Sequence, residues 1–248
     1  MKTIVLAAGY ATRLYPVTEN FPKPLLEIGG VSIIDRLIRD VDAIDEIDSH
    51  LIVSNHRYFP HFEKWVNVHR YTKKITLLDD GSTDNDNRLG AVRDLLLAVE
   101  TFQLYNDDLL VIAADNVVNF SFQGFIDYFM EKQTSLIMTC YEPDLTALRR
   151  TGVITKDENN KVLEMEEKPE NPKSHFAVPP FYIYKKSDVM FFQSCLLEGC
   201  HPDAPGNLVR HMLTKTVFYA WPMTGKRHDI GTLETYNRLN DGGRLVEN

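Results

Sequence analysis

Two cations follow closely on the first apolar segment of the chain. The stretch from Ile4 to Gly30 reads IVLAAGYATRLYPVTENFPKPLLEIGG and contains Arg13 and, between two prolines, Lys23. Ala7, Ala8, Gly9 and Ala11 carry little or no side chain, so backbone N–H groups there can come close to a phosphate or a base. Arg13 offers a planar fork of donors to phosphate oxygens, and Lys23 is a point cation on a stiffened backbone. The pattern predicts a site for a nucleoside triphosphate, and a small-residue strand-to-helix turn with surface cations is the alternative.

Three later segments carry charges that could complete such a site. Asp115 closes the apolar run VIAAD. Glu167 and Lys168 lie in EEKP, and Asp229 lies in HDIG. A carboxylate at the C-terminal end of a strand is well placed to hold a ligand or a metal ion. Taken singly, the three segments also suit a turn, a charged hairpin edge and a helix N-cap.

The charge of the chain restricts the partners that it can have. Its 248 residues are 44 % hydrophobic and 25 % charged, and the formal net charge is −8. This balance argues against a nucleic-acid partner, because binding a phosphate backbone needs a basic face. A polyanionic ligand would therefore need a few local cations, and a metal ion, to reverse the field inside its cleft.

Other features of the composition predict a cytoplasmic protein. Cys140, Cys195 and Cys200 form no CxxC pair and are expected to be reduced thiols. No apolar run approaches the roughly 20 residues of a membrane span, and a strand begins within three residues of the N-terminus, which leaves no room for a signal peptide. The histidines show no metal-ligand spacing. No membrane partner is expected, and homo-oligomerisation is left open.

Short apolar runs alternate with segments of helical periodicity. Strands are expected over 3–8, 50–55, 74–80, 107–115 and 134–142, and helices over 31–44, 89–102 and 122–133. Residues 58–69 are expected to form a helix or a turn with aromatic anchors. Strands that are apolar on both faces and separated by helices indicate an α/β fold with a doubly wound, mostly parallel, Rossmann-like sheet.

The pattern changes from Gly152 onward. We expect a hairpin over 152–169, an aromatic strand in FAVPPFYIYKKSDV leading into a helix near 189–197, a strand over 216–223 and a closing helix over 232–241. The second half of the chain is therefore a β-rich elaboration of the sheet, expected to bind the acceptor.

Four segments together resemble one protein family. LAAGxxTRLxP followed by PKP is similar to the LAAGxGTRL…PKP signature of the sugar-1-phosphate nucleotidyltransferases, which include glucose-1-phosphate thymidylyl- and uridylyltransferases. The chain's AADN, EKP and DIGT resemble the family's GDN, EKP and DTGT segments, in the same order. Neither a Walker A loop nor the GxGxxG fingerprint is present. Ala11 stands where the family has glycine. This difference raises the question of whether the backbone at position 11 needs a positive φ.

The resemblance implies a role for residues along the whole chain, expected to form one nucleotidyltransferase domain over 1–248. Residues 1–120 would mainly bind the NTP, and 121–248 would bind the acceptor and supply a second metal ligand. The implied catalytic residues are Arg13, Lys23 and Lys168, and the implied Mg²⁺ ligands are Asp115 and Asp229. The nucleotide-binding residues would be Leu6, Ala8, Gly9, Ala11, Thr12, Asp79, Arg88 and Gly90, and the acceptor-binding residues Gly152, Glu167, Lys168 and Val178.

The implied reaction transfers NMP from an NTP to a sugar 1-phosphate, with release of pyrophosphate and formation of an NDP-sugar. The attacking phosphate is already ionised, so positioning and charge neutralisation suffice for catalysis. Glu167 would accept hydrogen bonds from sugar hydroxyls, and Lys168 would neutralise the sugar phosphate. A short enzyme of this kind commonly serves polysaccharide or glycoconjugate synthesis.

The acceptor and the base stay open at this point. Pro179 and Pro180 replace the Thr-Gly pair of the family's sugar-pocket strand, removing two backbone donors. Nearby aromatic residues would also suit a cation, so cytidylyl-type transfer to phosphocholine or a polyol phosphate is an alternative. Asp79, Asp80 and Arg88 are candidates to read the base, although the family's usual glutamine is not evident.

Two further interpretations compete with this one. LLDDGSTDN resembles the VDDGSTD segment of family 2 glycosyltransferases, which use a nucleotide-sugar. Here it follows the third expected strand, and AADN replaces the DxD metal motif. A catalytically silent nucleotide sensor is the other alternative, although such a protein has no need of the complete charged set.

Overall fold

The computed structural model describes residues 1–241, so the last positions of the domain expected over 1–248 lie outside the described residues. The chain forms two compact units, each assembled from separate segments. Unit 1 comprises Met1–Lys2, Leu89–Ile112 and Gly124–Met223, and unit 2 comprises Thr3–Arg88, Ala113–Gln123 and, within the described residues, 224–241. The assignment of 1–120 mainly to the NTP and 121–248 mainly to the acceptor stays a prediction.

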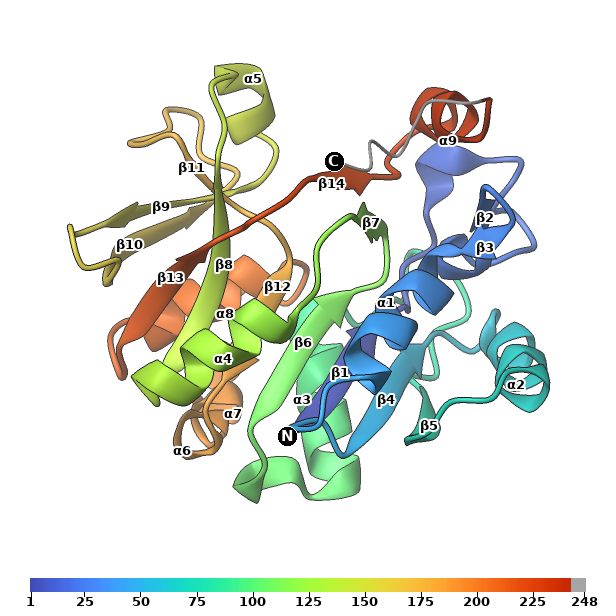
Figure 1. Cartoon of the computed structure of the whole chain (residues 1–248), viewed down its shortest axis with the longest axis horizontal. Coiled ribbons are helices and arrows are strands. Elements are labelled where there is room, and N and C mark those ends of the chain that lie inside the picture. The colour runs from blue at the N-terminus through green and yellow to red at the C-terminus, as the bar shows by residue number, and fades with distance from the viewer. Residues whose placement is uncertain (242–248) are drawn as a thin grey trace. The chain divides into compact units, whose positions relative to one another are not determined.

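Unit 2 contains the N-terminal strands that the apolar runs predicted. Its parallel strands β4 and β5 pair from Ser49↔Lys74 to Ser54↔Asp79, and β1 lies next to β4. Figure 1 shows α1 running alongside these strands and α2 beyond β5. Apart from single residues at their ends, the elements of unit 2 are β1 (Lys2–Leu6), η1 (Thr12–Leu14), η2 (Lys23–Leu25), β2 (Glu27–Ile28), β3 (Val31–Ser32), α1 (Ile33–Asp42), β4 (Ser49–Ser54), α2 (Phe59–Val68), β5 (Lys74–Asp79), β7 (Asn116–Val118), β14 (Arg227–Asp229) and α9 (Leu233–Asn240).

The sequence of α1 explains both its start and its packing. The Ser32 hydroxyl accepts a hydrogen bond from the backbone N–H of Asp35, which satisfies a donor of the first helical turn. Ile34, Leu37 and Val41 are fully buried and form the apolar stripe expected from their spacing. This stripe holds the helix against the core of unit 2.

A short antiparallel ribbon joins two segments that are far apart in the sequence. β7 follows the strand that ends at Ala113, and β14 precedes the closing helix. Their register pairs Asp229 with Asn116, and the N–H of Ile230 donates to the carbonyl of Asp115 at 3.1 Å. The ribbon therefore brings the DIGT segment next to the AADN segment.

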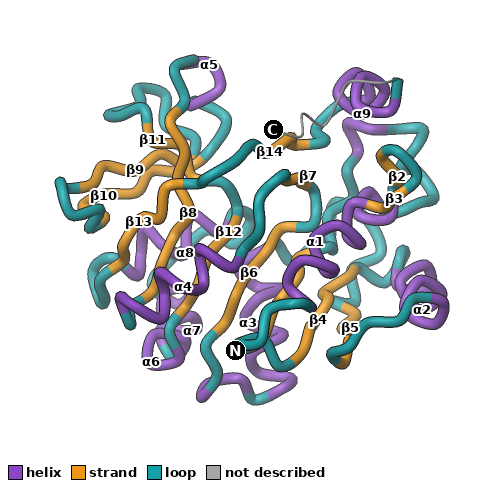
Figure 2. The backbone as a smooth tube through the Cα atoms, viewed as in Figure 1, coloured by secondary structure: helices purple, strands orange, loops and turns teal. Residues whose placement is uncertain are grey.

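Unit 1 contains the β-rich part of the chain, which is dense in strands in Figure 2. Its strands follow the order β10-β9-β11-β8-β12-β6, with β13 parallel to β8. Figure 1 shows α4 in front of this sheet and α8 behind it. Its elements are α3 (Ala91–Phe102), η3 (Leu104–Asn106), β6 (Leu109–Ala113), α4 (Gln123–Lys132), β8 (Ser135–Tyr141), α5 (Leu145–Leu148), β9 (Gly152–Lys156), β10 (Val162–Glu167), β11 (Phe176–Val178), β12 (Phe181–Tyr184), α6 (Lys186–Val189), α7 (Phe191–Leu197), α8 (Pro205–Met212) and β13 (Phe218–Pro222).

The expected hairpin over 152–169 is confirmed, but the single aromatic strand after it is wrong. β9 and β10 pair antiparallel, with Glu167 opposite Gly152. The aromatic segment is divided into β11 and β12 on either side of Pro179 and Pro180. Two successive prolines lack the N–H groups that a continuous ladder needs. β11 pairs with β9 and β8, whereas β12 pairs with β8 and β6.

The α/β class is confirmed, although the sheet is more mixed in unit 1 than the apolar strands suggested. β12 runs antiparallel to both of its neighbours, and only β13 pairs with β8 in parallel.

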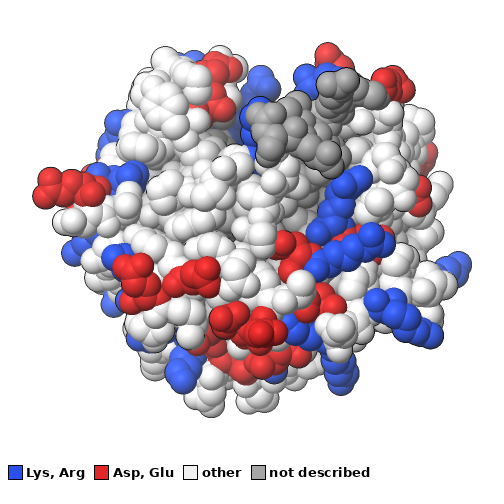
Figure 3. All heavy atoms as spheres, in the orientation of Figure 1, with Lys and Arg blue, Asp and Glu red and all other residues white. Residues whose placement is uncertain are grey.

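No helix among residues 1–241 is long and apolar enough to cross a membrane. On the face displayed in Figure 3, acidic side chains gather in the lower middle.

Candidate functional site

Lys23 is a buried cation held by two carboxylates of unit 2. Its side chain is only 9 % exposed, and its Nζ lies 3.2 Å from Asp115 Oδ2 and 3.5 Å from Asp229 Oδ1. Burying an ammonium group is costly unless opposite charge accompanies it. The PKP segment fixes the residue at the start of a 3₁₀ turn, with Pro22 as its N-cap. Three residues predicted from separate motifs therefore meet at one point.

Asn116 and Arg227, which the motifs did not single out, orient Asp115. The Asn116 amide donates to Asp115 Oδ1 at 2.5 Å, and Arg227 donates to Asn116 Oδ1 at 2.8 Å. Asn116 is buried, and Arg227 lies two residues before Asp229 on the partner strand of the ribbon. The β7–β14 pairing thus fixes Asp115 from both sides. A signal in the sequence was Asn116 itself, which directly follows the predicted ligand.

The pair of carboxylates suits a hard divalent cation. Asp115 and Asp229 converge on one positive charge, and their side chains are 42 % and 53 % exposed. Among the described residues, no three His, Cys, Asp or Glu side chains form a group that could enclose a metal ion. Mg²⁺ commonly takes one or two carboxylates and fills its other positions with water and substrate phosphates. The donor set fits such an ion.

Ala11 has a positive φ, the conformation that the family's glycine at this position suggested. Its φ of 46° and ψ of 43° are left-handed, a region that glycine adopts without strain and alanine does not. The Ala11 carbonyl accepts hydrogen bonds from the Thr18 hydroxyl at 2.8 Å and from the N–H of Leu14 at 2.9 Å. The loop therefore keeps the turn that a glycine would make, at a cost in backbone energy.

The rest of the first loop is fixed by buried partners. Asn55 is fully buried and donates to the Ala8 carbonyl at 2.9 Å, while its oxygen accepts from the N–H of Tyr58. Leu6 accepts a hydrogen bond from the N–H of Ala114. Gly9, Thr12 and Arg13 are exposed, and no carboxylate among the described residues pairs with Arg13. The loop thus presents exposed backbone and one unpaired guanidinium.

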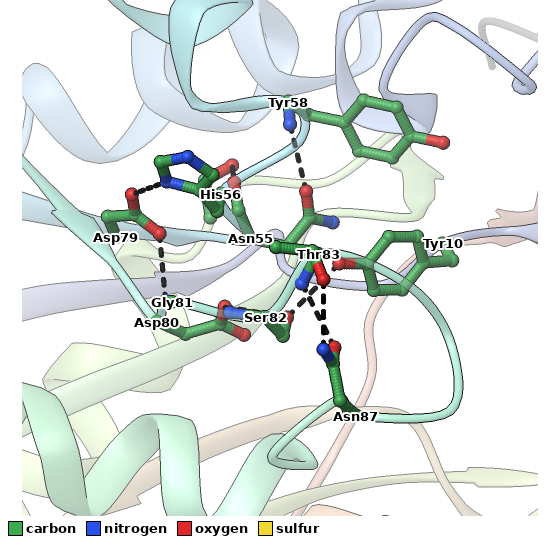
Figure 4. A network of polar contacts seen from close by, with 11 residues as sticks. Tyr10, Asn55, His56, Tyr58, Asp79, Asp80, Gly81, Ser82, Thr83 and Asn87 are labelled. Atoms are coloured by element: carbon green, nitrogen blue, oxygen red, sulfur yellow. Dashed lines mark hydrogen bonds and ion pairs between the residues drawn. The ribbon is translucent and has the colours of Figure 1, made fainter.

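The DDGSTDN loop after β5 is internally bonded, as Figure 4 shows. Asp79 accepts from His56 Nδ1 at 2.6 Å and from the N–H of Gly81 at 2.8 Å. Ser82 donates to Asp80 Oδ1 at 2.7 Å, and its hydroxyl lies 3.2 Å from that of Tyr10. The Asp79 carboxylate is therefore already engaged within the protein, and its role toward a base stays a prediction.

Arg88 and Gly90 follow this loop. A hydrogen bond fixes Arg88, and close packing surrounds Gly90. Arg88 is exposed and donates to the carbonyl of Asn85 at 2.8 Å. Gly90 belongs to unit 1, has a φ of 89°, and leaves no room for a side chain, because a Cβ there would lie 2.7 Å from the carbonyl oxygen of Pro202. Local packing alone thus requires glycine here, and a base contact stays a prediction.

The predicted acceptor residues lie together in unit 1. A Cβ at Gly152 would lie 3.2 Å from Glu167 Oε2 and 3.4 Å from Val178 Cβ. The N–H of Lys168 donates to the carbonyl of Thr151 at 3.1 Å, and the Thr151 hydroxyl donates to that of Val178 at 3.2 Å. Lys168 is exposed and has a φ of 48°, a conformation that is strained for a side chain of its size.

Glu167 is a carboxylate in an unfavourable environment. Burial raises the pKa of Glu167 above its usual 4.5, and the neighbouring Lys168 lowers it by less. None of the described residues donates a hydrogen bond to its side chain. Desolvation without hydrogen bonding disfavours the charged form of a carboxyl group. Among the residues predicted to bind the acceptor substrate, Glu167 therefore has a destabilised carboxylate that can accept hydrogen bonds.

Comparison with known proteins identifies the class. The sequence profile of the nucleotidyl transferase family matches residues 2–242. The chain belongs to this family. The resemblance drawn from the four motifs is thereby confirmed, and the comparisons add no support for a glycosyltransferase.

Individual relatives are similar over nearly the whole chain. A glucose-1-phosphate adenylyltransferase of Fervidobacterium nodosum is 26 % identical over 96 % of this chain, which spans only 60 % of that relative's length. A Bacillus anthracis protein provisionally assigned as a glucose-1-phosphate thymidylyltransferase, crystallised with sucrose, has a TM-score of 0.82 at 24 % identity, covering 100 % of this chain and 97 % of its own. A UDP-glucose pyrophosphorylase complexed with UDP-glucose has a TM-score of 0.79 at 21 % identity, covering 98 % and 97 %. The two structures confirm the fold.

Replacing Ala11 by glycine is expected to stabilise the protein. Ala11→Gly removes the cost of a left-handed alanine, about 1–2 kcal/mol. The greater entropy of glycine in the unfolded chain offsets this gain by about 0.4–1 kcal/mol. The free energy of unfolding in urea should therefore rise by up to about 1.5 kcal/mol. The control is Ala7→Gly, at a buried position without positive φ, which should lower it. A loss of stability in Ala11→Gly would contradict the strained turn.

The raised pKa of Glu167 predicts a stability that falls with pH. The folded protein holds this proton more tightly than the unfolded chain, so the contribution is fully present below the unfolded pKa and is lost as pH rises through the folded value. Glu167→Gln should therefore raise Tm above about pH 7 and have little effect near about pH 4. These two pH values lie on either side of the usual range of carboxyl pKa values.

The matched control for this experiment lies on the same strand. Glu164 is exposed and accepts from Lys173 at 2.7 Å, so Glu164→Gln should not raise Tm at any of these pH values. Thermal melts followed by circular dichroism measure both variants. A Tm of Glu167→Gln that is equal to wild type across the range would show that the carboxylate is well solvated.

Proposed function

We propose that the protein transfers a nucleoside monophosphate from an NTP to a sugar 1-phosphate. A phosphate oxygen of the acceptor attacks the α-phosphorus, the bond from that phosphorus to the bridging β-oxygen breaks, and pyrophosphate leaves. The observation that carries the proposal is the meeting of Lys23, Asp115 and Asp229 in a member of the nucleotidyl transferase family. No protein nucleophile is needed, because the attacking phosphate is already an anion.

Charge neutralisation is the main contribution of the residues in unit 2. Lys23 is preorganised by burial and by two carboxylates, so it can stabilise charge developing at the α-phosphate without reorganising. Arg13, which is exposed and free of carboxylate partners among residues 1–241, is assigned to the triphosphate and the departing pyrophosphate. The formal net charge of the whole chain is −8, which makes these local cations more necessary for an anionic substrate.

Asp115 and Asp229 would hold Mg²⁺. Held by these carboxylates, the ion would supply positive charge to neutralise the phosphate groups of the substrates. The protein's own part is to fix both carboxylates through the β7–β14 ribbon and to keep Asp115 oriented through Asn116 and Arg227. The half-exposed oxygens leave positions for water and phosphate.

The acceptor that we propose is a hexose 1-phosphate. The names of the relatives share glucose 1-phosphate or UDP-glucose while differing in the base. Glu167 would accept hydrogen bonds from ring hydroxyls, and Lys168 would pair with the acceptor phosphate. A product of this class would supply activated sugar for polysaccharide synthesis. We leave the base open, since the DDGSTDN loop carries no recognisable base-reading glutamine.

A pyrophosphate-release assay tests the function. Purified protein is supplied with ATP, UTP, dTTP, CTP or GTP, each crossed with hexose 1-phosphates, phosphocholine and a polyol phosphate, with and without Mg²⁺. We expect release to need one NTP and a hexose 1-phosphate together and to stop with EDTA. Release with phosphocholine alone would transfer the proposal to the cytidylyl-type alternative, and release from no pair would refute it.

Loss of Lys23 or of the Asp115 charge should abolish most turnover. Lys23→Ala or Asp115→Asn is expected to lower kcat by at least ~10²-fold, the scale of losing one preorganised electrostatic contact. Lys64→Ala, which removes a cation outside the site, serves as the control and should keep wild-type kcat. Circular dichroism checks that each variant is folded. Near-wild-type turnover in either site variant would reject the assignment.

Arg227 should matter because it positions Asp115 through Asn116. Arg227→Ala leaves the Asn116 amide without this donor, and removing such a supporting hydrogen bond typically costs about 10–100-fold in metal affinity or activity. The apparent Mg²⁺ requirement should rise, so excess Mg²⁺ should restore part of the rate. The control is Lys226→Ala, the adjacent exposed cation. Equal Mg²⁺ dependence in the two variants would contradict the positioning role.

A further inference from the structure

Gly206 lies where a side chain would collide with the carboxylate of Glu167. It is the second residue of α8, is buried, and has no positive φ. A Cβ at this position would overlap Glu167 Oε2 and would lie 2.5 Å from Met165 Cε. Glycine is thus required here by space and not by backbone conformation.

A second glycine faces the same two atoms from the sheet. Gly152 is opposite Glu167 in the β9–β10 register. A Cβ on Gly152 would overlap Met165 Cε and would lie 3.2 Å from Glu167 Oε2. The ends of Met165 and Glu167 therefore occupy a slot between two bare α-carbons, one from β9 and one from α8.

The slot offers the carboxylate no hydrogen-bond donor from residues 1–241. Among the described residues none donates a hydrogen bond to the Glu167 side chain, which is only partly exposed. An unpaired carboxylate in a confined position costs stability. A ligand that donates hydrogen bonds to it would recover that cost on binding. The two bare α-carbons give the ends of Met165 and Glu167 the space that they occupy.

We propose that Gly206 is a specificity-determining residue for the acceptor, because its bare α-carbon lets the Glu167 carboxylate occupy the slot and meet an acceptor that donates hydrogen bonds. The inference rests on the proposed function and deepens it. Both atoms that a Cβ would meet are ends of flexible side chains, so a methyl group moves Glu167 without unfolding the protein. The acceptor should suffer and the NTP should not.

Steady-state kinetics test this separation. Gly206→Ala should raise the KM for the hexose 1-phosphate by about 10-fold or more, the scale of one hydrogen bond to a charged group, with the KM for the NTP unchanged. The control is Gly124→Ala, where a Cβ would lie 3.1 Å from Trp221 in the same unit; it should leave both KM values unchanged. An unaltered acceptor KM in Gly206→Ala would overturn the proposal.

Two double variants show which side chain transmits the effect. Glu167→Ala removes the carboxylate, so adding Gly206→Ala to it should raise the acceptor KM no further. Met165→Ala removes the other collision, so Gly206→Ala should still raise the acceptor KM in that background. Full rescue by Met165→Ala would assign the effect to Met165 packing and overturn the role of Glu167.

A measurement without turnover separates this inference from the proposed function. Carboxyl groups are ordinarily ionised above about pH 7. In this range Glu167→Gln should raise Tm in the wild-type background. In the Gly206→Ala background this gain should shrink, because the displaced carboxylate reaches solvent. If the gain shrinks but no pyrophosphate is released from any substrate pair, the slot stands and the function fails. If the gain is the same in both backgrounds, the slot does not hold Glu167 and the proposal fails.

Discussion

The ion cluster of Lys23, Asp115 and Asp229 is the constraint on which unit 2 depends. An ammonium group that is 9 % exposed must be accompanied by negative charge, and two carboxylates within 3.5 Å provide it. Those carboxylates come from segments more than a hundred positions apart, so the chain must return to the AADN segment near its end. The β7–β14 ribbon makes that return, and its register sets how closely the two carboxylates approach the lysine.

Much of the fold and of this cluster could be predicted, because local pattern and physical need coincide there. The buried stripe of α1 and the apolar β4 have periodicities that permit one structure. Lys23 was identifiable from the stiff PKP context, and Asp115 from its place after an apolar strand. Ala11 is instructive too: the question of a positive φ came from the sequence, and the observed 46° answers it.

Other features depend on contacts between distant segments and left little local trace. β7 and β14 are three-residue strands whose pairing has no periodic signal, so Arg227 could not be connected with Asn116. The helix α8 begins in HPDAPGN, a run of turn-forming residues, and it was not predicted. Gly206 within it looks like one more loop glycine until Glu167 is placed beside it. Pro179 and Pro180 were noticed, but their effect on the strand appears only once β11 and β12 are paired with different neighbours.

The two units treat buried charge in opposite ways, and this contrast follows from what each charge would meet. Lys23 has its counterions built in, so its geometry is fixed before any ligand arrives, as electrostatic preorganisation requires. Glu167 has no donor among the described residues and its pKa is raised by burial, so the ligand itself must supply the missing partner. A site that must discriminate among hydroxylated sugar phosphates gains from such a group, because an acceptor without a suitably placed hydroxyl donor leaves the carboxylate without a hydrogen bond. The stability lost at Glu167 is thus the physical basis of the acceptor selectivity that we propose, and the preorganised charge around Lys23 is the basis of the catalysis that we propose.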